Sequence, residues 1–241
     1  MSLGSTRAGF VALLLALAAL AWLSTARQMS GMMGTRDLGT LGWFVGVWVV
    51  MMAAMMFPSV APTVALYARM SKMRVAPLVF AAGYLVTWTL PGVLAYGVWR
   101  AAHEPLGNAD RWLIGGTLLL AAAYELTPLK NVCLSKCRTP FGFLVGTWRD
   151  GYRGALEMGA RHGAWCVGCC WALMAGLFAL GVMSIAWMAV VALLIAAEKL
   201  LPWRRVATWG VAGILLVLGV LMLADPSAIP GLTIPGSGMG M

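Results

Sequence analysis

Charged residues are scarce in this sequence. Only 10% of its 241 residues are Asp, Glu, Lys or Arg, whereas 61% are hydrophobic. Soluble domains carry about 25% charged residues and about 45–50% apolar residues, which excludes an ordinary soluble domain. The chain is long and apolar enough to cross a lipid bilayer several times. We therefore expect an integral membrane protein.

Recognisable catalytic motifs are missing as well. The chain has only two histidines, and it contains no P-loop, no phosphorylation motif and no dinucleotide-binding fingerprint. One of the histidines, His103, precedes Glu104 in a segment that is typical of a solvated turn. No internal repeat is visible, which argues against an alternating-access transporter. We expect a protein that is not an enzyme and has no ATPase of its own.

Seven apolar stretches can each cross about 30 Å of hydrocarbon as a helix. Within the bilayer each span must satisfy its own backbone hydrogen bonds, as a helix does. The seven stretches therefore predict an all-α polytopic membrane protein with about seven transmembrane helices. The stretches are 9–26, 41–57, 77–99, 112–128, 163–183, 185–201 and 206–224. Arg7 and Ser24–Ala26 also make the first stretch resemble a cleavable signal, but its length and Trp22 favour a retained span.

Basic residues are unevenly divided between the two sides of this topology. Thirteen of the 17 Lys and Arg residues fall on the side of the N-terminus. The other four are Arg27, Arg36, Arg100 and Arg111. Because basic loops stay in the cytoplasm, we expect a cytoplasmic N-terminus, an external C-terminus and location in a bacterial inner membrane. The net charge of +9 then reflects this topology and attraction to the lipid bilayer, the expected partner, and it needs no nucleic-acid partner.

The five cysteines form two short groups. Cys133 and Cys137 follow the fourth predicted span, and Cys166, Cys169 and Cys170 open the fifth. Both groups fall at the cytoplasmic end, where thiols stay reduced and structural disulfides are rare. Thiols clustered there are metal ligands, redox centres or packing residues.

The spacing of the cysteines favours a metal site. Residues at i, i+3 and i+4 share a helix face, so the three later cysteines point one way, and His162 precedes them by one turn. The two earlier cysteines, four residues apart, share a face if their segment is helical. A dithiol facing a trithiol would form a thiolate-rich cage. The alternative is that small apolar cysteines only pack in a helix interface.

Methionines near the same end indicate which metal the site would bind. Met51, Met52, Met55 and Met56 form two stripes at a spacing of four residues, and further methionines lie in the predicted external segments. Thioethers and thiolates bind Cu(I) well, whereas thioethers suit zinc poorly. Methionine also fills gaps between helices, which is the competing interpretation. Cu(I) is favoured, and zinc remains possible because the cluster could supply four tetrahedral ligands.

Glu125 lies near the end of the fourth predicted span, and an ionisable residue at bilayer depth usually has a function. Its carboxylate could interact with His162 and orient that side chain as a metal ligand, without binding the metal itself. It could instead pair with Lys130 or Arg138. Glu198, at the end of the sixth span, reads as a helix-end pair with Lys199 at the interface.

The segment 141–160 carries apolar residues at helical spacing with arginines at the edge of the apolar face. This pattern predicts an amphipathic helix on the cytoplasmic surface, between the two groups of cysteines. Such a helix could cap the metal site or serve only as a membrane anchor. Three prolines near this face, Pro58, Pro62 and Pro128, are expected to kink or end their helices.

Several stretches together resemble a bacterial family of predicted metal-binding integral membrane proteins, which is linked to copper handling. The similarity runs from about residue 40 to 224 and is carried by Met51–Pro62, Lys130–Pro140, Gly168–Met174 and the pair Glu198–Lys199. The resemblance implies metal-binding roles for Cys133, Cys137, Cys169 and Cys170, and also for Cys166 and His162.

The sequence therefore leads to one main hypothesis, a membrane Cu(I) chaperone or transfer protein. We expect an N-terminal span and external loop at 1–40, a metal-binding helical domain at 41–224 and an external Gly/Met-rich tail at 225–241. A copper enzyme or a soluble metallochaperone would be the partner. The alternatives are a membrane thiol-disulfide oxidoreductase, which would exchange disulfides, and a structural assembly subunit.

Overall fold

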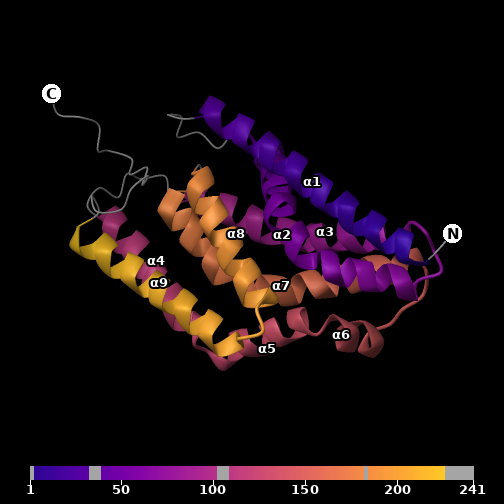
Figure 1. The fold of residues 1–241 in the computed structure, drawn as a ribbon. Coiled ribbons are helices and arrows are strands. Elements are labelled where there is room, and N and C mark those ends of the chain that lie inside the picture. Colours follow the sequence, from indigo (N-terminus) through magenta and orange to yellow (C-terminus); the bar gives the residue numbers. More distant parts are fainter. Residues whose placement is uncertain (1–2, 33–38, 102–108, 182–183, 226–241) are drawn as a thin grey trace. The chain divides into compact units, whose positions relative to one another are not determined.

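The computed structural model describes residues 3–32, 39–101, 109–181 and 184–225, and these residues form nine α-helices and no strand (Figure 1). The predicted all-α class is therefore confirmed. The helices are α1 (Leu3–Met32), α2 (Leu41–Met70), α3 (Ala76–Ala101), α4 (Ala109–Glu125), α5 (Pro128–Arg138), α6 (Pro140–Gly146), α7 (Gly151–Gly181), α8 (Ile185–Leu200) and α9 (Arg204–Ala224). The predicted external tail lies almost wholly outside the described residues, as do Met33, Arg36 and His103.

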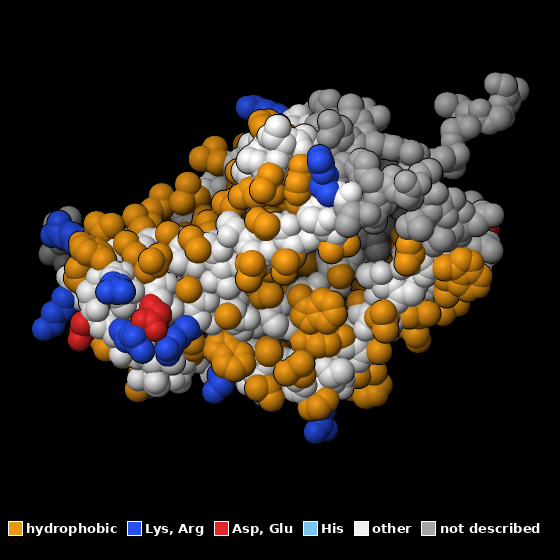
Figure 2. All heavy atoms as spheres, turned by 180° about the vertical axis from the view of Figure 1, so that it is seen from behind, with side chains coloured by type: hydrophobic (Ala, Val, Ile, Leu, Met, Phe, Trp, Pro, Cys, Tyr) orange, Lys and Arg blue, Asp and Glu red, His pale blue; other side chains and the backbone are white. Residues whose placement is uncertain are grey.

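Four of these helices, α1, α2, α3 and α9, contain a stretch long and apolar enough to cross a membrane. Helices α4 and α5 could together form a fifth span, bent by 68° at the break between them. Helix α8 has 16 residues and is about 24 Å long, shorter than the hydrocarbon core of about 30 Å. The seven predicted spans are thus not confirmed as a set. Hydrophobic side chains cover much of the surface in Figure 2, as expected of a protein in lipid.

The chain divides into two compact units. The first comprises Met1–His103 and Asn131–Cys169, and the second comprises Glu104–Lys130 and Cys170–Met241. In the first unit α2 is central, because it packs along α1 and α3 and also contacts α6. In the second unit α4 packs along α9, which also contacts α8.

Helix α2 continues through Pro58 and Pro62, which were expected to kink or end it. Proline lacks the N–H that would bond to the carbonyl four residues earlier, so Pro58 leaves the carbonyl of Ala54 without its helical donor. The indole Nε1 of Trp22 in α1 donates to this carbonyl oxygen at 3.0 Å. The neighbouring helix therefore supplies the hydrogen bond that the proline removes, as membrane helices require.

The segment 141–160 does not form the single amphipathic helix that was predicted. It is split between α6 and the first turns of α7, with residues 147–150 outside either helix. Gly151 adopts a φ of +81°, a conformation that glycine accepts more readily than other residues, and the chain turns there into α7. Helix α7 then approaches α3 so closely that a Cβ at Gly159 would overlap the backbone carbonyl of Phe80.

Candidate metal centre

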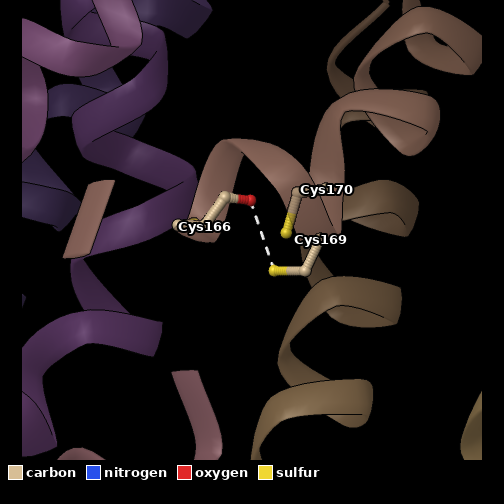
Figure 3. A group of neighbouring side chains, drawn as sticks. All are labelled: Cys166, Cys169 and Cys170. Carbon is tan, nitrogen blue, oxygen red and sulfur yellow. Dashed lines mark hydrogen bonds between the residues drawn. The ribbon is translucent and has the colours of Figure 1, made fainter. Parts of the chain in front are cut away.

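The three later cysteines lie on two consecutive turns of α7. Their Sγ atoms are all within 4.8 Å of one another, and all three side chains are buried. The thiol of Cys169 donates to the carbonyl oxygen of Cys166 at 3.2 Å. The sulfur of Cys170 lies next to the sulfur of Cys169 (Figure 3). The predicted i, i+3, i+4 grouping on one helix face is therefore present, and α7 alone determines its geometry.

The two earlier cysteines lie on α5, so their segment is helical, as their spacing required. Pro128 is the first residue of this helix, a position that suits proline, and the hydroxyl of Thr127 accepts a hydrogen bond from the backbone N–H of Lys130 at 3.3 Å. This N-terminal cap starts the helix one turn before Cys133. The capped helix presents both cysteines at an i, i+4 spacing.

The structure brings the dithiol of α5 against α7. The Sγ atoms of Cys137 and Cys169 are 3.8 Å apart. Cys133 fills the space above Gly168, where an added Cβ would come within 2.7 Å of the Cys133 sulfur. None of the five cysteines, all of which the structure describes, forms a disulfide. The predicted arrangement of a dithiol facing a trithiol is thus seen in the packing of α5 on α7.

His162 lies one turn before Cys166 on α7 and is buried, but it does not belong to the compact group of three cysteines. Its ring is surrounded by those of Phe80, Tyr84 and Phe143, with centroids 5.0–6.1 Å away. The hydroxyl of Tyr84 also lies 2.8 Å from the Sγ of Cys166. Tyr84 was not among the predicted site residues, because nothing in the sequence around it shows that α3 packs against α7 at this point.

The four methionines are buried in the core of α2, each exposing 3% or less of its surface. Met51, Met52, Met55 and Met56 are not part of the compact sulfur group on α7. Their burial among α1, α2 and α3 fits the competing interpretation, in which methionine fills the gaps between helices.

Glu125 forms an ion pair with Lys130, one of the three partners that the sequence left open, beside His162 and Arg138. The Nζ of Lys130 also lies 2.6 Å and 2.7 Å from the two carboxylate oxygens of Glu198. All three side chains are at least 98% buried. Glu198, which was expected to form a helix-end pair with Lys199, is thus buried against Lys130. The sequence offered Lys130 as a partner for Glu125 but not for Glu198, which lies 68 residues away along the chain.

The chemistry available at α5 and α7 is that of several soft sulfur donors in a dry environment. Thiolate ligands favour Cu(I), zinc or iron–sulfur clusters over hard cations such as Mg²⁺. The sulfurs of Cys166, Cys169 and Cys170 lie within 4.8 Å of one another, and the sulfur of Cys137 lies 3.8 Å from that of Cys169. The group fits a soft metal ion without a change of fold.

The described residues define an all-helical protein with several helices long and apolar enough to cross a membrane and a candidate site for a soft metal. Residues 45–222 match the PpoB2 family, described as copper chaperones, and the chain belongs to this family. The match confirms the resemblance to a copper-handling family. No curated protein and no solved structure matches the chain.

Proposed function

We propose that this protein binds Cu(I) at its α5–α7 thiols and transfers it to another protein. The observation that carries the proposal is the group of three buried α7 thiols with a fourth thiol, Cys137, 3.8 Å from Cys169. Family membership supports copper as the cargo. Cys133 completes the sulfur set, and His162 and the α2 methionines are auxiliary.

Cu(I) fits this set better than zinc for a chemical reason. Structural zinc sites hold four ligands in a tetrahedron and stabilise small folds that need the metal. Here the helices already pack through large buried surfaces, so a structural zinc is not required. Cu(I) accepts a few soft sulfurs, so it can leave one thiolate for another during transfer.

The proposal includes a topology and partners. Seven spans, with the N-terminus in the cytoplasm of a bacterial inner membrane, would place α5 and the α7 cysteines at the cytoplasmic face, although α7 begins at Gly151, before the predicted span 163–183. The distribution of basic residues supports this orientation. The partner would be a copper enzyme or a soluble metallochaperone, and the protein itself would perform no catalysis.

The test is elemental analysis of protein purified without oxygen, beside a Cys166→Ser/Cys169→Ser/Cys170→Ser variant. We expect approximately stoichiometric copper in the wild type and its loss from the variant. Replacing Met51 and Met55 with leucine provides the control, because it removes two thioethers and should leave most of the copper bound. Zinc or iron in place of copper, or a wild type that refuses Cu(I) on reconstitution, would contradict the proposal.

A second candidate function is thiol-disulfide exchange, favoured by the short distance between the sulfurs of Cys137 and Cys169. Two thiols on different helices can approach bonding geometry with a small shift, whereas the adjacent Cys169 and Cys170 would form a strained disulfide. Trapping a mixed disulfide between a Cys169→Ser variant and a partner protein would support this function. Full copper-enzyme maturation in that variant would argue in the same direction.

A further inference from the structure

The five thiols differ in their access to solvent. Cys133, Cys166, Cys169 and Cys170 each expose 6% or less of their surface, whereas Cys137 is partly exposed. Cys137 is also the thiol whose sulfur lies 3.8 Å from that of the buried Cys169. A carrier on that side of α5 can therefore contact the Cys137 sulfur without opening the fold, and an ion bound there has the buried Cys169 sulfur beside it.

The charges around Cys137 indicate what kind of carrier fits. The cysteine lies between Lys136 and Arg138 in the last turn of α5, and the side chain of Lys136 is exposed. Positive charge beside a binding group attracts anionic partners and raises their association rate. A Cu(I) complex of an anionic thiol, such as glutathione, carries the negative charge that such a partner needs. Its sulfur can also be displaced from the copper by a cysteine thiol.

We propose that Cys137 receives Cu(I) from an anionic thiol carrier and passes it to Cys169, an inference that rests on the proposed function. In the first exchange a copper–sulfur bond forms to Cys137, and the bond between copper and the carrier sulfur breaks. The thiol proton of Cys137 moves to the departing carrier sulfur. The second exchange is the same reaction between Cys137 and Cys169. Copper stays Cu(I) throughout, so neither step needs an oxidant or a reductant.

The test compares the rate of loading with the final amount of copper bound. Cu(I) is offered as its glutathione complex to the full-length protein in detergent without oxygen, and copper–thiolate absorbance is followed by stopped flow. We expect Cys137→Ser to slow loading by about tenfold or more while the α7 thiols still retain copper at equilibrium. Cys166→Ser should lower the amount retained instead. Loading of Cys137→Ser at the wild-type rate would overturn the proposal.

A second measurement uses the wild-type protein and needs no variant. One equivalent of N-ethylmaleimide is added to the reduced, copper-free protein, and the labelled peptide is identified by mass spectrometry. We expect label on Cys137 before any other cysteine, and first labelling elsewhere would contradict its role. A wild type that binds no copper would refute the proposed function, whereas this labelling would still test the accessibility of Cys137.

The charge of the carrier is tested with Lys136→Glu. This change leaves every thiol in place and reverses one charge beside Cys137. Loading from the glutathione complex should slow several-fold at low salt, and the difference should shrink as salt screens the charges. Arg205→Glu on α9 is the matched control, since this residue is also exposed but lies on a different helix. Equal rates for Lys136→Glu and the wild type would refute an anionic carrier.

Discussion

The two units of the chain bury different kinds of reactive group. Four of the five cysteines belong to the first unit, where buried thiols lie on facing helices. The second unit buries an ionised group, the triad of Glu125, Lys130 and Glu198. Neutral thiols lose little on leaving water and pack like small apolar side chains. Buried charges lose their hydration and are stable only when they compensate one another.

This difference predicts how the stability of each unit changes when one thiol or one charged side chain is removed. A thiol can be removed without leaving an unpaired charge. Its loss should therefore lower the affinity for a bound metal more than it lowers the stability of the fold. Removal of Lys130, the one cation of the triad, leaves the carboxylates of Glu125 and Glu198 buried without a compensating charge. We infer that the thiol group is maintained for chemistry, and that the triad is an obligatory part of the folded second unit.

The largest predicted effect follows from Lys130→Met. This change leaves two carboxylates buried without their cation and should lower the free energy of unfolding by about 3–5 kcal/mol. Thermal unfolding in detergent, followed by circular dichroism, would measure it. Lys136→Met is the control, because Lys136 is exposed on the same helix and its loss should change stability little.

Replacing the whole triad sharpens this prediction. With Glu125→Leu and Glu198→Met added to Lys130→Met, no buried charge remains, and much of the lost stability should return. If the triple variant is as unstable as Lys130→Met alone, the cost comes from lost packing or lost hydrogen bonds. The contrast between buried charges and buried thiols would then fail.

The sequence predicted the elements of the thiol group better than those of the triad, for a physical reason. Helical spacing depends only on neighbours along the chain, so the common face of Cys166, Cys169 and Cys170 could be predicted without tertiary structure. The pairing of Lys130 with Glu198 depends on which distant helices pack together. No local pattern encodes that packing.

Errors in the predicted fold have a similar origin. Pro58 was expected to kink or end its helix, and α2 does not end there, because the indole of Trp22 supplies the missing hydrogen bond from another helix. The segment 141–160 has helical spacing throughout, but the backbone at Gly151 turns between two separate helices. In both cases the local pattern was present, but the structure depended on something that the pattern does not contain: a hydrogen bond from another helix at Pro58 and a positive φ at Gly151.

The second prediction concerns the backbone carbonyl of Ala54, a buried but uncharged polar group of the first unit. Trp22→Phe removes the donor to the carbonyl of Ala54 and leaves that oxygen unsatisfied, which should cost about 1–3 kcal/mol. The same thermal measurement applies, with Trp43→Phe as control because Trp43 is exposed on α2. Equal stabilities for the two variants would show that the helix tolerates the proline without help from α1.

The third prediction joins stability to metal binding. Tyr84→Phe removes the hydroxyl that lies 2.8 Å from the Cys166 sulfur and should cost about 1 kcal/mol. It should also weaken Cu(I) binding several-fold in competition with a chromophoric chelator, because the hydroxyl stabilises the thiolate that binds the metal. Tyr96→Phe removes a comparable hydrogen bond to the carbonyl of Gly39, so it should change stability without changing copper affinity.

The smallest effect on stability is predicted for Cys169→Ser in the copper-free protein. The serine hydroxyl has nearly the shape of the thiol and can donate to the carbonyl of Cys166 as the thiol does now. The free energy of unfolding should therefore change by about 1 kcal/mol or less, although copper binding falls sharply. Thermal unfolding and copper content of the same preparation provide both values. A loss of stability as large as that of Lys130→Met would mean that this thiol is held for packing, and the distinction between the two regions would disappear.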